Sequence, residues 1–187
     1  MKNAIYLLQT QTRFQNQSDI ITTCDGKVIA VDGGFKEDAC YFISNLKQIT
    51  GQEKPHIDAW FFTHAHIDHI GLATRFIADY KDKVSVQAFA YQFPNSNKIS
   101  VSMESVEKMK EDIDISEQNI QSSYPKATIY TLHTGQSYYF SGVEIEILWT
   151  VDDTYPANYS SFNDLSAALR FKFADGKRVL LLGDCMH

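Results

Sequence analysis

The sequence predicts a mixed α/β fold in which sheets carry helices on their outer faces. Candidate strands come first as hairpins, then alternate with helical segments, and finally return as hairpins. Strands separated by helices and strands joined by short turns belong to one mixed sheet architecture. The chain has 187 residues, of which 44% are hydrophobic, so it can bury a sizeable core. We therefore expect a single domain over residues 1–187.

Short apolar runs bounded by turn residues predict the strands. In chain order, the expected strands span residues 5–8, 20–24, 28–31, 57–63, 84–91, 128–132, 137–140, 143–149, 167–173 and 178–182. Asp25-Gly26 and Ser141-Gly142 are hairpin signals between neighbouring strands. Residues 59–62 are continuously apolar, which is typical of a strand covered on both faces.

Helical spacing and helix-ending residues predict three helices, over residues 38–49, 69–80 and 102–122. The first is followed by Gly51, and Pro55 lies shortly beyond it. Apolar residues recur at helical spacing in the second. The third is long, charged and amphipathic, and its charged face is expected to be solvated. These helices fall between strands, as the mixed architecture requires.

Composition disfavours several classes of function. The net charge is −6, which disfavours extended binding of nucleic acid, although a metal could still attract a phosphodiester. Three cysteines in wide spacing give neither a disulfide framework nor a CxxC zinc site, and they favour a reducing, cytoplasmic location. No apolar run is long enough for a signal peptide or a membrane span, so we expect no membrane association.

A cluster of metal-binding residue types follows the strand predicted over residues 57–63. His64 and His66 are two residues apart at a strand end, so their side chains point the same way and can chelate one ion. Asp68 and His69 come where the chain turns into a helix, and they suit a second ion. Asp184, at the end of the last strand, is the best candidate for a bridging carboxylate. Paired ions would activate a hydroxide for hydrolysis, and Asp68 could hold or accept a proton.

The turn before Asp184 fits this interpretation. We expect residues 180–182, three consecutive leucines, to form a buried strand that delivers the aspartate to the site. Gly183 has no side chain, so it leaves room for a close approach of the backbone.

These residues resemble a known family. His64 to His69 resembles the HxHxDH signature of the metallo-β-lactamase superfamily, and residues 31–34 and 181–184 resemble its early and later aspartate motifs. Their order and approximate spacing agree over nearly the whole chain. The resemblance implies an αβ/βα sandwich with a two-metal site at one edge of the sheets. It also implies that Asp32 orients the ligand loop through hydrogen bonds.

The sequence departs from the family pattern in two places. The loop after residue 149 has no histidine, which leaves His133, Asp152 or Asp153 as open candidates for a further ligand. The chain ends three residues after Asp184, so we expect the C-terminal part of the fold to be missing, with His187 as a candidate last ligand. Such a chain would expose apolar surface through which it could form a homodimer.

The residues therefore predict a metal-dependent hydrolase that uses a metal-activated hydroxide. Zinc is the expected metal, with two ions, but imidazole and carboxylate ligands also accept iron or manganese. Residues 163–166 are similar to the competence-type DNA-uptake branch of the family, which favours a phosphodiester over an ester, thioester or lactone. Two alternatives stay open: an iron-dependent redox enzyme that resembles sulfur dioxygenases, and a non-catalytic fragment or interaction module.

Overall fold

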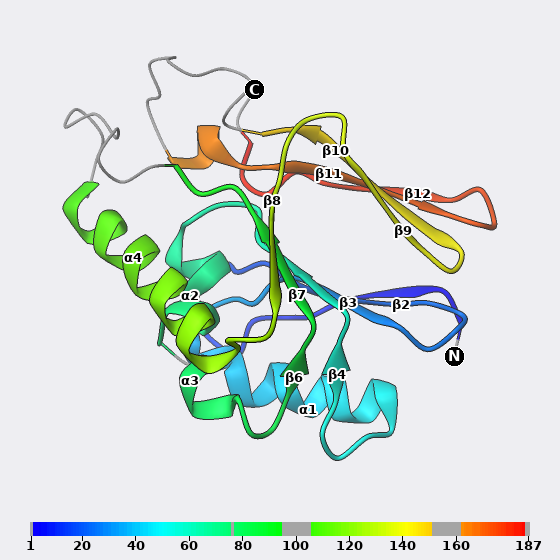
Figure 1. The fold of residues 1–187 in the computed structure, drawn as a ribbon, viewed down its shortest axis with the longest axis horizontal. Coiled ribbons are helices and arrows are strands. Elements are labelled where there is room, and N and C mark those ends of the chain that lie inside the picture. The colour runs from blue at the N-terminus through cyan, green and yellow to red at the C-terminus, as the bar shows by residue number, and fades with distance from the viewer. Residues whose placement is uncertain (1, 76, 95–105, 151–161, 186–187) are drawn as a thin grey trace.

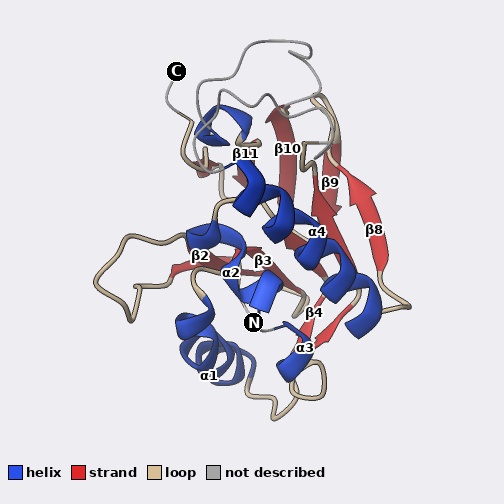
Figure 2. Cartoon of the chain, turned by 90° about the vertical axis from the view of Figure 1, so that its left-hand side faces the viewer, coloured by secondary structure: helices blue, strands red, loops and turns tan. Residues whose placement is uncertain are grey.

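Two sheets pack face to face, and helices cover the outer face of the larger sheet (Figure 1). The computed structural model describes residues 2–75, 77–94, 106–150 and 162–185. The mixed α/β fold predicted from the sequence is confirmed. On the outer face of the smaller sheet, the described part of the chain places no α-helix (Figure 2). Nor is any described helix both long and apolar enough to cross a membrane.

Parallel and antiparallel pairing meet in the larger sheet. Its described strands are, in spatial order, β1 (Ala4–Leu7), β2 (Ser18–Thr22), β3 (Val28–Asp32), β5 (Ala59–Phe61), β7 (Ala88–Tyr91) and β8 (Thr128–Thr131). The first three pair antiparallel, and the last four pair parallel. Because these four strands run parallel, they all end at the same edge of the sheet. That edge carries the candidate site.

The smaller sheet is an antiparallel meander. Its described strands are, in spatial order, β12 (Arg178–Leu181), β11 (Ala168–Phe173), β10 (Val143–Trp149) and β9 (Ser137–Phe140). Two further strands, β4 (His56–Ile57) and β6 (Ser85–Val86), form a short parallel pair. Glycine turns with positive φ join β9 to β10 and β11 to β12, as the sequence predicts.

The helices are α1 (Ala39–Thr50), α2 (Ile67–Arg75), α3 (Ile77–Tyr80) and α4 (Val106–Ser123), with 3-10 turns at Lys36–Asp38 and Phe162–Leu165. Helix α1 ends at Gly51, whose φ of 70° is left-handed and whose N–H donates to the Lys47 carbonyl at 2.8 Å. The helix predicted over residues 69–80 begins two residues earlier than expected, and its described parts are α2 and α3. Asp68 and His69 consequently both lie in the first turn of α2, whereas the predicted helix begins at His69.

Strand β5 has an apolar side chain on each face because both faces are covered. Trp60 points into the core between the larger sheet and the helices, where it stacks on Phe42 with ring centroids 5.2 Å apart. Phe61 points the other way, into the core between the two sheets. The indole N–H of Trp60 donates to the Asp32 carbonyl at 2.8 Å, so the core packing also fixes the backbone at the end of β3.

Two expectations about strands are wrong in detail. Asp58 separates β4 from β5, because its carboxylate accepts the Val28 N–H at 2.8 Å and Lys27 Nζ at 3.1 Å. Leu180 and Leu182 are 54% and 44% exposed, so the last leucine run is not a buried strand. Strand β12 lies at the edge of its sheet, where Leu181, the residue between these two leucines, faces the other sheet together with Val179.

Candidate metal centre

The predicted ligands converge at one edge of the sandwich. His64 and His66 lie in the turn between β5 and α2, and Asp68 and His69 lie in the first turn of α2. Asp184 follows β12 and so comes from the other sheet. The structure thus brings together, from both layers, all five residues that the sequence suggested as ligands.

The donor atoms form two groups that share one carboxylate. His64, His66 and Asp184 each offer an atom within 4.8 Å of the others, and so do Asp68, His69 and Asp184. Imidazole nitrogen and carboxylate oxygen at this spacing fit zinc and also fit iron or manganese. This donor chemistry fits two ions with Asp184 between them, which is the arrangement predicted from the sequence.

Burial keeps the first histidine pair neutral. The ring nitrogens His64 Nε2 and His66 Nδ1 are 2.9 Å apart. Burial, together with the positive charges of His69 and His66, lowers the pKa of His64 to about 2. Burial also lowers the pKa of His66. A neutral imidazole offers the lone pair that a metal requires, so the interior favours the ligand form of both rings.

Carboxylates surround His69 on both sides. Its Nδ1 donates to Asp32 Oδ2 at 2.8 Å, and its Nε2 lies 3.4 Å from Asp184 Oδ1 and 3.9 Å from Asp68 Oδ2. Burial would lower the pKa of His69, but these carboxylates outweigh it and raise the pKa to about 10. The bond from His69 is the main reason that the pKa of Asp184 is lowered. Asp32 therefore directs Nε2 toward the two other carboxylates.

Asp32 is held in an unusual backbone conformation. It is fully buried with φ of 52°, a left-handed value that is uncommon for residues other than glycine. Besides the His69 ring, its carboxylate accepts the Thr63 N–H at 2.8 Å and the Thr63 hydroxyl at 2.7 Å. Asp32 thus joins the end of β3, the end of β5 and α2. The sequence predicted an orienting role for Asp32, and these contacts supply the hydrogen bonds for it.

Sequence reasoning did not identify Thr63 or Ser166. The Thr63 hydroxyl lies within hydrogen-bonding distance of Nδ1 in both His64 (3.2 Å) and His69 (3.3 Å). The Ser166 hydroxyl accepts the Asp184 N–H at 3.1 Å and thereby orients the shared aspartate. Thr63 directly precedes the histidine cluster, which is the only sequence signal for it. Ser166 belongs to residues 163–166, which are similar to the competence-type branch, but nothing in the sequence pairs Ser166 with Asp184.

The open candidates for further ligands are not brought into either group. His133 is exposed and belongs to neither described group of donors. Asp152, Asp153 and His187 lie outside the described residues.

Gly183 is needed for the approach of Asp184. Its φ is 54°, and a Cβ there would meet Ser166 Oγ at 2.8 Å and Thr63 Oγ1 at 3.0 Å. We expect Gly183→Ala to lower stability by about 2 kcal/mol, since a left-handed alanine costs about 1 kcal/mol before any clash. It should also weaken zinc binding several-fold by displacing Ser166, measured by competition with a chromophoric chelator.

Gly176→Ala is the matched control for this variant. Gly176 also has a positive φ, of 85°, but a Cβ there would meet nothing within 4 Å. It should therefore show the backbone cost alone, with unchanged zinc affinity. Equal zinc affinities in the two variants would show that the space at Gly183 is not required.

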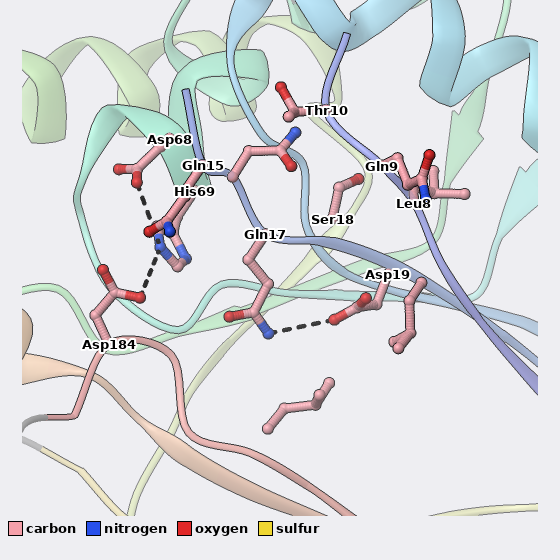
Figure 3. Close-up of a pocket in the computed structure, with 13 residues that line it drawn as sticks. Leu8, Gln9, Thr10, Gln15, Gln17, Ser18, Asp19, Asp68, His69 and Asp184 are labelled. Carbon is pink, nitrogen blue, oxygen red and sulfur yellow. Dashed lines mark hydrogen bonds and ion pairs between the residues drawn. The ribbon is translucent and has the colours of Figure 1, made fainter. Parts of the chain in front are cut away.

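A cleft of about 700 Å³ opens beside the metal centre (Figure 3). Asp68, His69 and Asp184 line one part of it, and the connection between β1 and β2 lines another. The Gln17 N–H donates to the Asp68 carbonyl at 3.3 Å, which ties this connection to the metal centre. Asp38 anchors the same connection through the Gln11 N–H at 2.6 Å. The cleft therefore leads to the metal centre between walls that are partly polar and partly apolar.

Comparison with known proteins agrees with this geometry. A model of the metallo-beta-lactamase superfamily matches residues 15–144, whereas no curated protein sequence matches the chain. Members of the superfamily bind divalent metal ions, typically zinc, and are generally metal-dependent hydrolases.

Solved structures of this fold are similar to the chain at low sequence identity. A variant of a HARLDQ-motif metallo-beta-lactamase from Cronobacter sakazakii is 18% identical with a TM-score of 0.58, over 94% of this chain and 59% of that one. The metallo-beta-lactamase fold protein YhfI from Bacillus subtilis is 17% identical with a TM-score of 0.53, over 94% and 60%. The class B3 di-zinc metallo-beta-lactamase LRA-12 from an Alaskan soil metagenome is 15% identical with a TM-score of 0.57, over 96% and 59%.

The chain spans about three fifths of the length of these solved structures. The two-sheet sandwich with outer helices that the sequence motifs imply is confirmed as a metallo-beta-lactamase fold, although in the described residues α-helices cover the larger sheet alone. On the match over residues 15–144, the chain belongs to the metallo-beta-lactamase superfamily.

Proposed function

We propose that this chain is a metal-dependent hydrolase with a two-ion centre. The observation that carries the proposal is the pair of donor groups that share Asp184. His64 and His66 would hold one ion, and Asp68 and His69 the other. When bound, such ions supply a water nucleophile at neutral pH and positive charge against the oxyanion that develops on the substrate.

The protein's own residues prepare the site for this chemistry. Asp32 fixes the ring of His69, and the Ser166 hydroxyl fixes the backbone N–H of Asp184. Asp68 lies at the edge of the cleft with its side chain 27% exposed, so it can meet both a ligand and solvent. We assign to Asp68 the further role of holding or accepting a proton during turnover.

A phosphodiester is the favoured substrate class, ahead of esters, thioesters and lactones. Its support is the similarity of residues 163–166 to the competence-type branch, together with the fit of a two-ion centre to phosphoryl transfer. We retain the branch as a prediction from sequence.

Metal content and turnover, measured together, test this function. Protein purified without added metal should contain about two zinc ions per chain and hydrolyse bis(p-nitrophenyl) phosphate faster than ester, thioester and lactone probes. His66→Ala should abolish that activity. Stoichiometric iron with oxygen consumption would instead indicate the redox alternative, and little metal with no turnover would indicate a non-catalytic chain.

A further inference from the structure

One buried carboxylate beside the cleft takes no part in the metal centre. Asp19 lies on β2, paired with Leu7 on β1 and Val31 on β3. Its side chain shares a face with Ile21, which packs in the core between the two sheets. A carboxylate therefore stands where the strand pattern would place an apolar residue, at the point where this core opens into the cleft.

Asp19 is poorly satisfied by the protein itself. It is only 4% exposed, and from the described residues its side chain accepts one hydrogen bond, from Gln17 Nε2 at 3.2 Å (Figure 3). Burial outweighs that bond and raises the pKa of Asp19 to about 6, with Asp32 raising it further and His69 lowering it. Buried charge with so little compensation lowers stability, so a purely structural role is a poor explanation.

The rest of the cleft offsets little of this charge, since His69 lowers the pKa of Asp19 but is the weakest of the influences on it. The described residues that line it include no Lys and no Arg. Asp68 and Asp184 belong to the donor groups of the metal centre, whereas Asp19 belongs to neither group. A ligand in the cleft would thus meet the carboxylate of Asp19, whose negative charge would not be balanced by ions bound to Asp68 and Asp184.

A second polar group in the same cleft also lacks a partner. The hydroxyl of Ser18 is buried, the residue being 3% exposed, and it makes no hydrogen bond with any described residue. Native proteins rarely leave such a group unpaired unless a ligand or water pairs with it. Ser18 and Asp19 are adjacent on β2, so their side chains point to opposite faces of the sheet, and the Ser18 hydroxyl is a separate unpaired group of the cleft lining.

We infer that Asp19 is a specificity residue that receives a protonated amine of the substrate. This inference rests on the proposed hydrolase function and narrows its substrate to phosphodiesters or esters with an ammonium group near the scissile bond. Gln17 positions the carboxylate, because its backbone N–H is bound to Asp68 while its side chain is bound to Asp19. The ammonium would donate to Asp19 while the ester group faces the metal centre.

A matched pair of small ligands tests the inference by binding alone. 2-Aminoethyl phosphate and propyl phosphate differ in an ammonium group that replaces a methyl group of similar size. Zinc-loaded protein should bind the amine about 10-fold more tightly in calorimetry, since a charge-assisted bond to a buried carboxylate is strong. Asp19→Asn should remove most of this preference, and Asp19→Leu should reverse it in favour of propyl phosphate.

The variants are expected to fold, so a null result is interpretable. Because folding raises the pKa of Asp19, the folded protein is more stable when Asp19 is protonated, and this added stability is lost as pH rises through about 6. At about pH 8, both Asp19→Asn and Asp19→Leu should therefore melt no lower than the unsubstituted protein. Asp25→Asn, an exposed carboxylate at the far end of the same hairpin, is the control that should keep the preference.

Two outcomes would overturn the inference: equal affinities for the two ligands in the unsubstituted protein, or an undiminished preference in both Asp19 variants. The p-nitrophenyl esters of the same two phosphates separate this result from the proposed function. Amine preference in binding without hydrolysis of either ester would contradict the hydrolase and support the role of Asp19. Hydrolysis of both esters at equal kcat/KM, with equal binding of the two ligands, would support the hydrolase and contradict the role of Asp19.

Discussion

Replacing Asp184 with Asn is expected to reduce hydrolysis by about 10³-fold or more, because both donor groups lose their shared ligand at once. The amide is close to the carboxylate in shape, but it is neutral and a weak metal ligand. The measurements are kcat/KM with bis(p-nitrophenyl) phosphate and the zinc content by elemental analysis. Since the Asp184 side chain is 40% exposed, the variant should fold normally.

The control for Asp184→Asn is Asp175→Asn, in the turn that joins β11 to β12. Asp175 is exposed and pairs only with the neighbouring Lys177 in the described contacts. The Asp175→Asn substitution removes the same charge as Asp184→Asn and should leave zinc content and turnover unchanged. Full zinc content in Asp184→Asn would contradict the shared-ligand arrangement.

Asp32→Asn should weaken zinc binding by about 10- to 100-fold, although Asp32 is not itself a ligand. Asparagine tolerates the left-handed backbone that this position requires, so the change isolates the side chain. Its NH2 group would face His69 Nδ1 in place of the carboxylate oxygen and donate to it. The ring proton would then move to Nε2, the atom that faces Asp68 and Asp184. Competition with a chelator measures the affinity.

Asp38→Asn is the matched control for a buried carboxylate away from the metal centre. Asp38 is 2% exposed and accepts hydrogen bonds from the backbone N–H of Gln11 and the side-chain amide of Asn16. Both variants should lower thermal stability, because each disturbs buried hydrogen bonds. Only Asp32→Asn should change zinc affinity; equal losses in both would trace the effect to general destabilisation.

Sequence predicted the features that depend on neighbours in the chain. The spacing of His64 and His66, the glycine turns and the apolar run of β5 each act over a few residues, and the structure retains them all. The position of Asp184 depends on the packing of one sheet on another. It was inferred from a family resemblance as well as from the strand before it, since no local pattern brings it near the histidines.

Tertiary context decided the features that the sequence did not predict. The leucines at 180 and 182 resemble a buried run, but β12 is an edge strand, and edge position is not encoded locally. Asp58 interrupts a strand because its carboxylate binds the start of β3, far away in sequence. Asp19 resembles an ordinary polar residue in an alternating strand until both neighbouring strands and the opposite sheet are in place.

The origin of the donors in two different layers has a mechanical consequence. Residues 64–69 belong to one sheet's edge and Asp184 to the other's, with a long stretch of chain between them. A bound cation would act as a reversible cross-link between the layers and would stabilise the folded protein, because it binds the assembled site and not the unfolded chain. Chelators should then lower the melting temperature as well as the activity. Once the ion is removed, the backbone amides where the two sheets meet at the metal centre should be the first to exchange their protons.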